Sequence, residues 1–155
     1  SSSVIFKKYE KRAQKIRRLY MKNIVAKGEW SDQCPFEKSN DLSEDNHQLA
    51  VITRATIKIS KLRKFWSYVP TSHQKLAKNP GLIYTKGVGE IPIIQMATFS
   101  LWKNKEALHA FAYESKEHAQ AIKMTRELDW YKEELFARFQ VYKQFGESFE
   151  KQELN

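Results

Sequence analysis

Cysteine is nearly absent from this chain of 155 residues, which contains Cys34 alone. A single cysteine excludes an internal disulfide framework and a metal site built from several thiolates. No histidine lies near Cys34 in the sequence to act as its base. We therefore interpret Cys34 as an incidental thiol rather than a nucleophile.

Long apolar runs are also missing. No stretch approaches the roughly twenty apolar residues that a helix needs to cross a bilayer. The first stretch, SSSVIFKKYEKR, lacks the apolar core of a secretory signal. We therefore expect a cytoplasmic protein. Its apolar and aromatic fractions, 41% and 13%, are typical of a packed globular domain.

Several motifs for catalysis are absent as well. Gly87, Val88 and Gly89 are expected in a turn between two strands, whereas a phosphate-binding glycine loop precedes a helix. The sequence has no serine elbow and no His/Cys set at zinc-binding spacing. Any chemistry must therefore come from residues outside these motifs.

Positive charge is concentrated near the start of the chain. The formal net charge is +9, and the first thirty residues hold nine Lys or Arg against Glu10 and Glu29. Residues 6–20 read as an amphipathic helix whose apolar stripe needs a protein surface. Its basic face could be simply solvated, or could bind an acidic protein or the inner membrane peripherally. No aromatic residue is interleaved on that face, so nucleic acid is not expected to bind there.

The rest of the chain alternates between strand and helix patterns. The expected strands are 21–26, 49–57, 82–88, 95–102 and 135–142. The expected helices are 60–78, a short helix capped by Asn104, and 116–124 after a second possible cap at Ser115. Pro70 is expected to kink or break the first of these at Val69.

From residue 49 onward this order is β-α-β-β-α-β. It predicts an α+β, ferredoxin-like fold with a four-stranded antiparallel sheet and helices on one face. Residues 31–48 are expected to be a linker loop, 49–145 the ferredoxin-like domain and 146–155 a tail. A weak echo between RRLYMKNIVA and LDWYKEELFA suggests that residues 1–30 are the remnant of a preceding repeat. The chain is therefore expected to be part of a longer two-repeat protein, or to close its barrel by dimerisation.

The sheet face turned away from the helices is predicted to be large and partly apolar. It is expected to carry Ile52, Arg54, Thr56, Met96, Thr98, Ser100, Trp102, Phe136, Arg138, Gln140 and Tyr142. Two such faces could enclose a ligand cavity, or could form a plain dimer interface in which the arginines pair with acids. Either way we expect a homodimer with Phe136 and Trp102 near its centre.

Four histidines are the remaining candidates for chemistry. His47 falls in a polar loop and His109 off its helix's apolar stripe, so both are expected at the surface. His73 and His118 lie on apolar faces, where a histidine is either a satisfied core residue or a ligand. Imidazole is a common axial ligand of haem iron, so His118 is the candidate metal ligand.

Four segments carry a family resemblance. They are LAVITRATIKISKLRKFWSYVP, GLIYTKGVGEIP, QMATFSLWKNKEALHAFAY and WYKEELFARF. Together they resemble the spheroidene monooxygenase family of carotenoid-oxidising enzymes, over about residues 9–142. More distantly, the arrangement is similar to dimeric α+β barrel proteins, including haem-degrading monooxygenases.

The resemblance implies a haem-dependent monooxygenase. Such an enzyme would use molecular oxygen and an electron donor such as ferredoxin to introduce a keto or hydroxyl group into an acyclic carotenoid. It implies His118 as the axial ligand of haem iron, Trp102 and Tyr131 as catalytic residues, and Trp130, Arg54 and Arg138 as cofactor-binding residues. Either arginine could pair with haem propionates or form a structural salt bridge. The alternative is a non-catalytic ferredoxin-like dimer that binds a hydrophobic ligand or haem.

Overall fold

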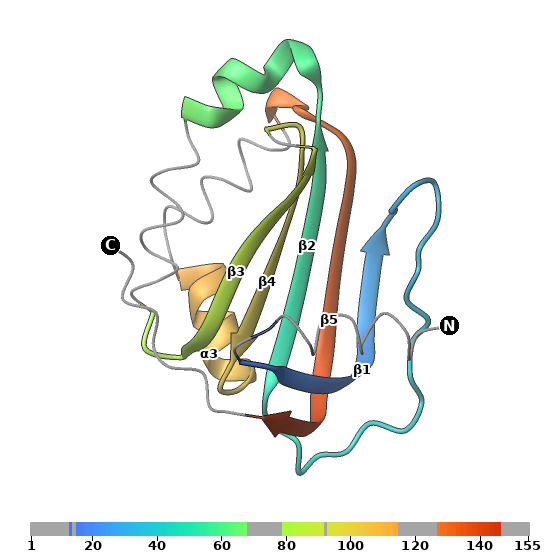
Figure 1. The fold of residues 1–155 in the computed structure, drawn as a ribbon, viewed down its shortest axis with the longest axis vertical. Helices are drawn as coiled ribbons and strands as arrows, with labels where there is room; N and C mark the ends of the chain where they lie inside the picture. The colour runs from blue at the N-terminus through green and yellow to red at the C-terminus, as the bar shows by residue number, and fades with distance from the viewer. Residues whose placement is uncertain (1–12, 14, 68–78, 92, 115–126, 147–155) are drawn as a thin grey trace.

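A computed structural model describes residue 13 and residues 15–67, 79–91, 93–114 and 127–146 (Figure 1). Its five strands are β1 (Arg17–Gly28), β2 (Leu49–Ile57), β3 (Leu82–Ile91), β4 (Gln95–Trp102) and β5 (Tyr131–Gly146). They form one sheet in the order β1-β5-β2-β4-β3, and every pair is antiparallel. The order of the last four strands is that of a ferredoxin-like sheet. The predicted fold is confirmed.

Short helical segments connect the strands. A 3₁₀ turn, η1 (Ile59–Lys61), leads into helical residues 62–67, and α3 (Lys105–His109) passes into a π-helical turn, η2 (Ala110–Glu114). The predicted kink at Pro70 and the predicted helix 116–124 lie outside the described residues. Within the described residues no helix is long and apolar enough to span a membrane.

The start of α3 agrees with the helix cap predicted from the sequence. The Asn104 side-chain oxygen accepts a hydrogen bond from the Ala107 N–H at 2.9 Å, so the predicted cap is confirmed. Gly81 lies against the same helix, because a Cβ built on it would come within 2.2 Å of the Ala107 Cβ. A glycine here lets the start of β3 approach α3.

The predicted helix over residues 6–20 is wrong for residues 17–20, which belong to β1. The four residues pair with Lys143–Gly146 of β5 and continue the ladder that runs on to Gly28. Leu19 and Met21 pack into the core from this strand. Tertiary pairing with the 16-residue β5 therefore overrides the local helical pattern.

The predicted end of the third strand at Val88 is also wrong. β3 continues to Ile91, so Gly87 and Gly89 lie inside a strand and not in a turn. Gly87 pairs with Thr98, and the register shifts between Gly89 and Ile91. Glycine in a strand commonly marks such an irregularity rather than an end.

The register corrects the predicted faces of β4 and β5. Residues directly opposite one another in an antiparallel pair lie on the same face, and Leu49 lies opposite both Trp102 and Gln140. α3 packs on that face, with the rings of Trp102 and Phe111 5.3 Å apart. The residues wrongly placed on the bare face are Met96, Thr98, Ser100, Trp102, Phe136, Arg138, Gln140 and Tyr142. Both faces of these strands carry large side chains, so the sequence pattern does not show which face packs against α3.

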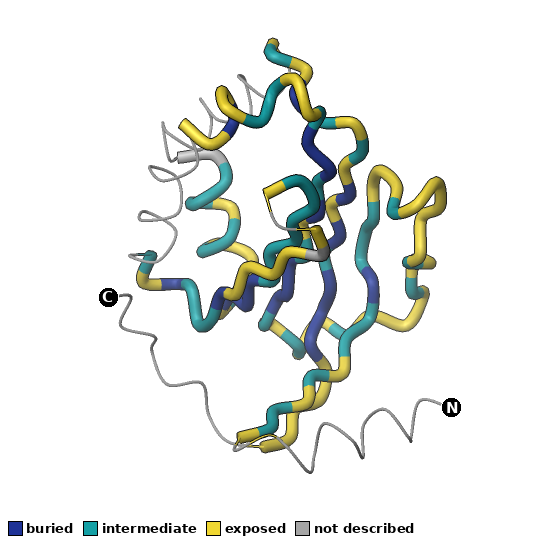
Figure 2. The backbone as a smooth tube through the Cα atoms, turned by 45° about the horizontal axis from the view of Figure 1, so that its top comes forward, coloured by how far each residue is buried: buried dark blue, intermediate teal, exposed yellow. Residues whose placement is uncertain are grey.

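Three clusters form the core, and Figure 2 shows buried backbone concentrated on the central strands. The face away from α3 carries Ala50, Leu101, Ala137, Phe139 and Val141. Phe36, from the loop after β1, covers the β5 side of that face, with its ring 5.0 Å from Phe139. Helical residues 62–67 join the third cluster through Phe65, which packs with Ile57 and Trp130.

Candidate functional site

A buried ion pair stands on the sheet face away from α3. The Arg54 side chain is 3% exposed, and its Nη1 donates to Glu133 Oε2 at 2.5 Å. The Thr56 hydroxyl also donates to Oε2, and the Asp32 backbone N–H donates to Oε1, both at 3.3 Å. The Trp30 ring covers the guanidinium, with its centroid 4.8 Å from Cζ.

This arrangement gives Arg54 a structural role. The hydrogen bond from Arg54 lowers the pKa of Glu133 below the usual range of a glutamate, and burial opposes that shift. The carboxylate thus stays ionised and compensates the buried guanidinium. Of the two roles left open for Arg54, the structure favours a salt bridge within the chain.

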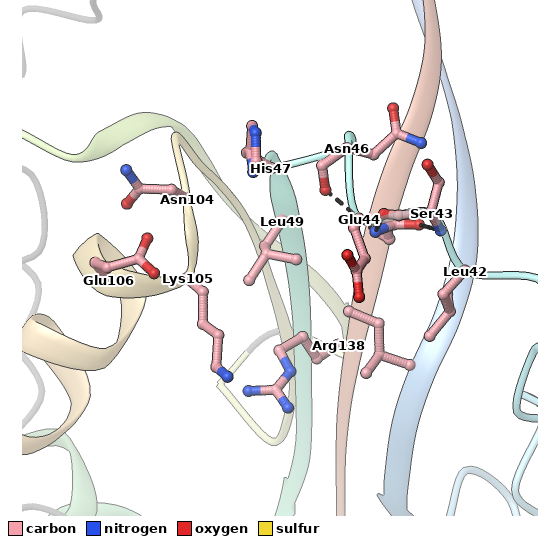
Figure 3. A pocket seen from close by; sticks show the side chains of 12 residues that line it. Leu42, Ser43, Glu44, Asn46, His47, Leu49, Asn104, Lys105, Glu106 and Arg138 are labelled. Carbon is pink, nitrogen blue, oxygen red and sulfur yellow. Dashed lines mark hydrogen bonds between the residues drawn. The ribbon is translucent and has the colours of Figure 1, made fainter.

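A pocket of about 480 Å³ opens on the opposite face, between α3, β5 and the loop before β2 (Figure 3). It is lined by Ile24, Leu42, Ser43, Glu44, Asn46, His47, Leu49, Asn104, Lys105, Glu106, Arg138 and Gln140. Its wall therefore combines a few apolar groups with many polar ones. Such a composition suits a ligand that carries charge or hydrogen-bonding groups at one end.

Gln140 holds the loop side of this pocket in place. Its amide nitrogen donates to the backbone carbonyls of Ser43, at 2.5 Å, and Asn46, at 3.1 Å. Its side-chain oxygen accepts from the Ser43 N–H at 2.9 Å. These three bonds use both amide hydrogens and one of the two acceptor positions of Gln140 in positioning the loop, so we assign it no contact with a ligand.

Arg138 is different, because its Nε is buried and has no hydrogen-bond acceptor among the described residues. Its guanidinium and the ammonium of Lys105 both extend into the pocket in Figure 3. A buried donor left unsatisfied is costly, so a ligand oxygen would find a prepared partner here. Arg138 from β5 and Lys105 from α3 supply two cations that suit a carboxylate or a phosphate, whereas Glu44 and Glu106 in the same lining oppose an anion.

The predicted catalytic residues Trp102 and Tyr131 do not share a site. Trp102 lies opposite Leu49 at the start of β2, and Tyr131 lies opposite Ile57 at its end. Eight residues of strand separate these positions, which is about 26 Å at the usual rise. Trp102 is 1% exposed beneath α3, and its indole N–H donates to the Ser100 hydroxyl at 2.9 Å. Trp102 is a core residue.

The predicted cofactor-binding residues are also dispersed. Trp130 is 3% exposed and packs edge-on against Phe65, with ring centroids 5.2 Å apart. Arg54 and Arg138 lie on opposite faces of the sheet, so they cannot bind one haem together. The predicted iron ligand, His118, lies outside the described residues, as does His73.

Sequence reasoning missed the pocket residues His47 and Lys105. The loop that carries His47 has no periodicity, and nothing in the sequence places it beside β5. Lys105 could have been predicted from the cap, because Asn104 makes Lys105 the first residue of α3. The first side chains of a capped helix project from the edge of the sheet.

Comparison with known proteins identifies relatives of the chain. No protein-family model matches it. It is 34% identical over 147 residues to spheroidene monooxygenase of Cereibacter sphaeroides, and 35% identical over 139 residues to that of Rhodobacter capsulatus. The chain is related in sequence to the spheroidene monooxygenases. The matches cover 94% and 88% of the chain but only 45% and 57% of these relatives, so the chain spans about half their length.

Solved structures support the fold alone. A protein from Fusobacterium nucleatum, provisionally described as a monooxygenase, superposes with a TM-score of 0.60 at 14% identity, over 96% of this chain and 64% of that one. SnoaB of Streptomyces nogalater, described as a cofactor-independent oxygenase, has a TM-score of 0.50 at 12% identity, over 63% of this chain and 95% of that one. Both likenesses agree with the ferredoxin-like sheet order.

Proposed function

We propose that this chain belongs to a monooxygenase that introduces a keto or hydroxyl group into an acyclic carotenoid. The observation that carries the proposal is the 34–35% identity to two spheroidene monooxygenases over about nine-tenths of the chain. The ferredoxin-like fold supports it. Because the matches cover only 45% and 57% of these relatives, the activity is proposed for the whole protein and not for this chain alone.

The reaction defines what the protein must supply. In hydroxylation, one atom of molecular oxygen enters a C–H bond of the carotenoid, and the other leaves as water. An external donor of the ferredoxin class provides two electrons, and two protons are taken up. A second hydroxylation at the same carbon, which uses another molecule of oxygen, two more electrons and two more protons and releases a second water, gives a geminal diol that loses water to form the ketone. The protein must hold an apolar chain and keep water from the reacting end.

The sheet face away from α3 is the proposed surface for the carotenoid. Ile52 and Phe99 lie on it opposite one another and are half-buried, and Val88, 58% exposed, extends the apolar surface towards the edge of the sheet. A second copy packed sheet to sheet would enclose these groups in a slot. We therefore propose a homodimer centred on Ile52 and Phe99 and not on Trp102.

Size exclusion with light scattering tests this assembly. We expect a dimer for the wild-type chain and a monomer, or a weaker dimer, for Phe99→Ser. Phe136→Ser removes an exposed aromatic from the opposite face and serves as the matched control. A wild-type monomer at micromolar concentration would refute the assignment, as would dissociation by Phe136→Ser alone.

Haem remains part of the proposal through His118. When bound, haem would activate molecular oxygen for insertion. The pocket with Arg138 and Lys105 opens on the α3 face, across the sheet from the proposed carotenoid surface, so we assign neither residue to a haem that would act on the carotenoid there. Arg54 does not fit the role of a propionate partner, because Glu133 already binds it.

A haem titration separates the two candidate histidines. We expect a Soret band that His118→Ala abolishes and His47→Ala leaves unchanged. Arg138→Gln should leave haem binding unchanged, because Arg138 lies on the sheet face opposite the proposed carotenoid surface. If His47→Ala removes the band, His47 and not His118 would be the residue that holds the haem. If the wild-type chain gives no Soret band, the haem proposal is wrong.

An isotope experiment tests the activity. The chain is incubated with an acyclic carotenoid in detergent micelles, a reductant and isotope-labelled oxygen gas, with and without haem. Mass spectrometry should find the label in a keto or hydroxyl product. Bound pigment without incorporation would indicate the alternative, a non-catalytic module that holds a hydrophobic ligand.

A further inference from the structure

Large apolar side chains are exposed together at one end of the molecule. We call this surface the apolar tip, and it consists of Ile59, Trp66, Ile91 and Ile93. Ile59 is 76% exposed and Ile93 is 59% exposed, although isoleucine is among the residues most often buried. η1, the following helix and the β3–β4 turn meet here, at the top of Figure 1.

Hydrogen bonds hold the parts of the tip together. The Trp66 indole N–H donates to the Ile93 carbonyl at 3.1 Å, which ties the helix to the turn. The Ile94 N–H closes the turn on the Ile91 carbonyl at 3.1 Å, and the Ile57 N–H donates to the Ile94 carbonyl at 2.9 Å. The exposed groups are therefore presented by an ordered frame.

The backbone conformation of Ile93 lowers the stability of the fold. Its φ is +74°, in the left-handed region that glycine and asparagine occupy most easily. A β-branched residue there is strained, and its exposed side chain recovers little of that cost through burial. A turn selected for stability would carry glycine at this position, so the isoleucine points to a role at the surface.

Positive charge gathers on one side of the tip, along η1 and the following helix. From residue 57 to residue 67 the sequence contains Lys58, Lys61, Arg63 and Lys64 and no acidic residue. Lys58 pairs with Asp129 at 2.5 Å. Lys61 ends η1 and is half-buried, whereas Arg63 and Lys64 stand on the helix that also carries Trp66 and are exposed. Exposed isoleucine and tryptophan interleaved with cations are typical of segments that lie in a membrane interface.

We propose that the apolar tip docks on an anionic lipid surface, with its apolar groups entering the headgroup boundary and the three cations facing lipid phosphates. A protein partner fits less well, because lysine is depleted from protein interfaces and the tip stands at one end of the long axis. The docking goes beyond the proposed oxygenase function and does not depend on it, since lipid binding is measured without turnover.

Sedimentation with vesicles tests the proposal. The chain should sediment with vesicles of phosphatidylcholine mixed with phosphatidylglycerol, much less with phosphatidylcholine alone, and less as salt rises. Replacing Lys61, Arg63 and Lys64 together by alanine should lower the affinity on the order of a hundredfold, at a factor of about five for each cation. Ile59→Ser combined with Ile93→Ser should lower it at least about tenfold through lost apolar burial.

A matched control removes the same charge elsewhere. Lys27, Lys38 and Lys103 are exposed and lie away from the tip, so replacing these three by alanine should change the affinity by less than about threefold. Circular dichroism confirms that each variant is folded. Brominated lipid should quench Trp66 fluorescence, and Trp66→Phe should remove that quenching.

Three results would overturn the proposal. They are equal loss of binding in the tip and control variants, no binding of the wild-type chain to the mixed vesicles, and a change of oligomeric state by light scattering when Ile59 and Ile93 are replaced. The last result would show that a second copy covers the tip. If the wild-type chain fails to bind vesicles but still oxygenates the carotenoid in detergent, the docking proposal is wrong and the proposed function stands.

Discussion

Replacing Glu133 by glutamine would leave the Arg54 guanidinium buried without its carboxylate. The Arg54 side chain is 3% exposed, so water cannot take the place of the lost partner. Removing one member of a buried ion pair typically costs 3–5 kcal/mol. Glutamine keeps the shape and one acceptor, and the Trp30 ring still covers the cation. We therefore expect the lower end, about 3 kcal/mol, which is a fall in Tm of roughly 6–12 °C for a domain of this size.

The double variant Arg54→Met with Glu133→Leu should recover most of that loss, because it removes both charges together. Urea unfolding of the wild type, Arg54→Met, Glu133→Leu and the double variant gives the coupling energy of the pair. Equal stability of the wild type and Glu133→Gln at neutral pH would refute the reasoning, since it would mean that the buried guanidinium does not need the carboxylate.

The same pair predicts a pH dependence. Arg54 lowers the pKa of Glu133 in the folded state, so the unfolded state binds the proton more readily. The pair therefore contributes its full stability above the unfolded glutamate pKa, near 4.3, and loses it as pH falls through the lower folded value. The stability difference between the wild type and Glu133→Gln should shrink below about pH 4. A difference that stays constant down to pH 2 would contradict this account.

Three other predictions concern named positions. Trp102→Ala leaves a cavity beneath Phe111 and should cost about 3–5 kcal/mol in urea unfolding, whereas a loss under 1 kcal/mol would mean that α3 does not cover the ring. Asn104→Ala removes the cap of α3 and should cost about 1 kcal/mol, while Asn104→Ser should restore most of it. Ile93→Gly relieves the left-handed strain and should raise stability by about 0.5–1 kcal/mol in the same assay, and any destabilisation would show that the side chain packs in the fold.

Strong local patterns made part of the fold predictable. The bounds of β2 and β4 and the cap at Asn104 follow from alternation and from helix-start chemistry, and the structure has them where the sequence predicts. These features depend on near neighbours in the chain. The ferredoxin-like order then follows from the sequence of elements.

Pairing partners and faces were harder to predict. β1 is a strand at residues 17–20 because β5 lies beside it, and no local signal announces that partner. Trp102 alternates with Leu101, and both are buried, so hydrophobicity does not say which one meets α3. Central strands covered on both faces lose the simple inside-outside pattern.

The candidate site was predictable only as a list of residue types. Arg54 and Arg138 both carry guanidinium groups on long strands, but only the register places them on opposite faces. Only the fold gives Arg54 a carboxylate 79 positions away and places Arg138 in the pocket with Lys105.

The position of β5 has a consequence for how the chain folds. β5 follows the other four described strands in the sequence, yet it lies between β1 and β2 in the sheet. On a ribosome, β1 and β2 would emerge with unpaired edges and wait for β5, because they have no ladder with each other. Sheets held by such distant pairings fold slowly, over milliseconds to seconds. During that delay the nascent chain would be prone to aggregation, so its yield in cells should depend on chaperones.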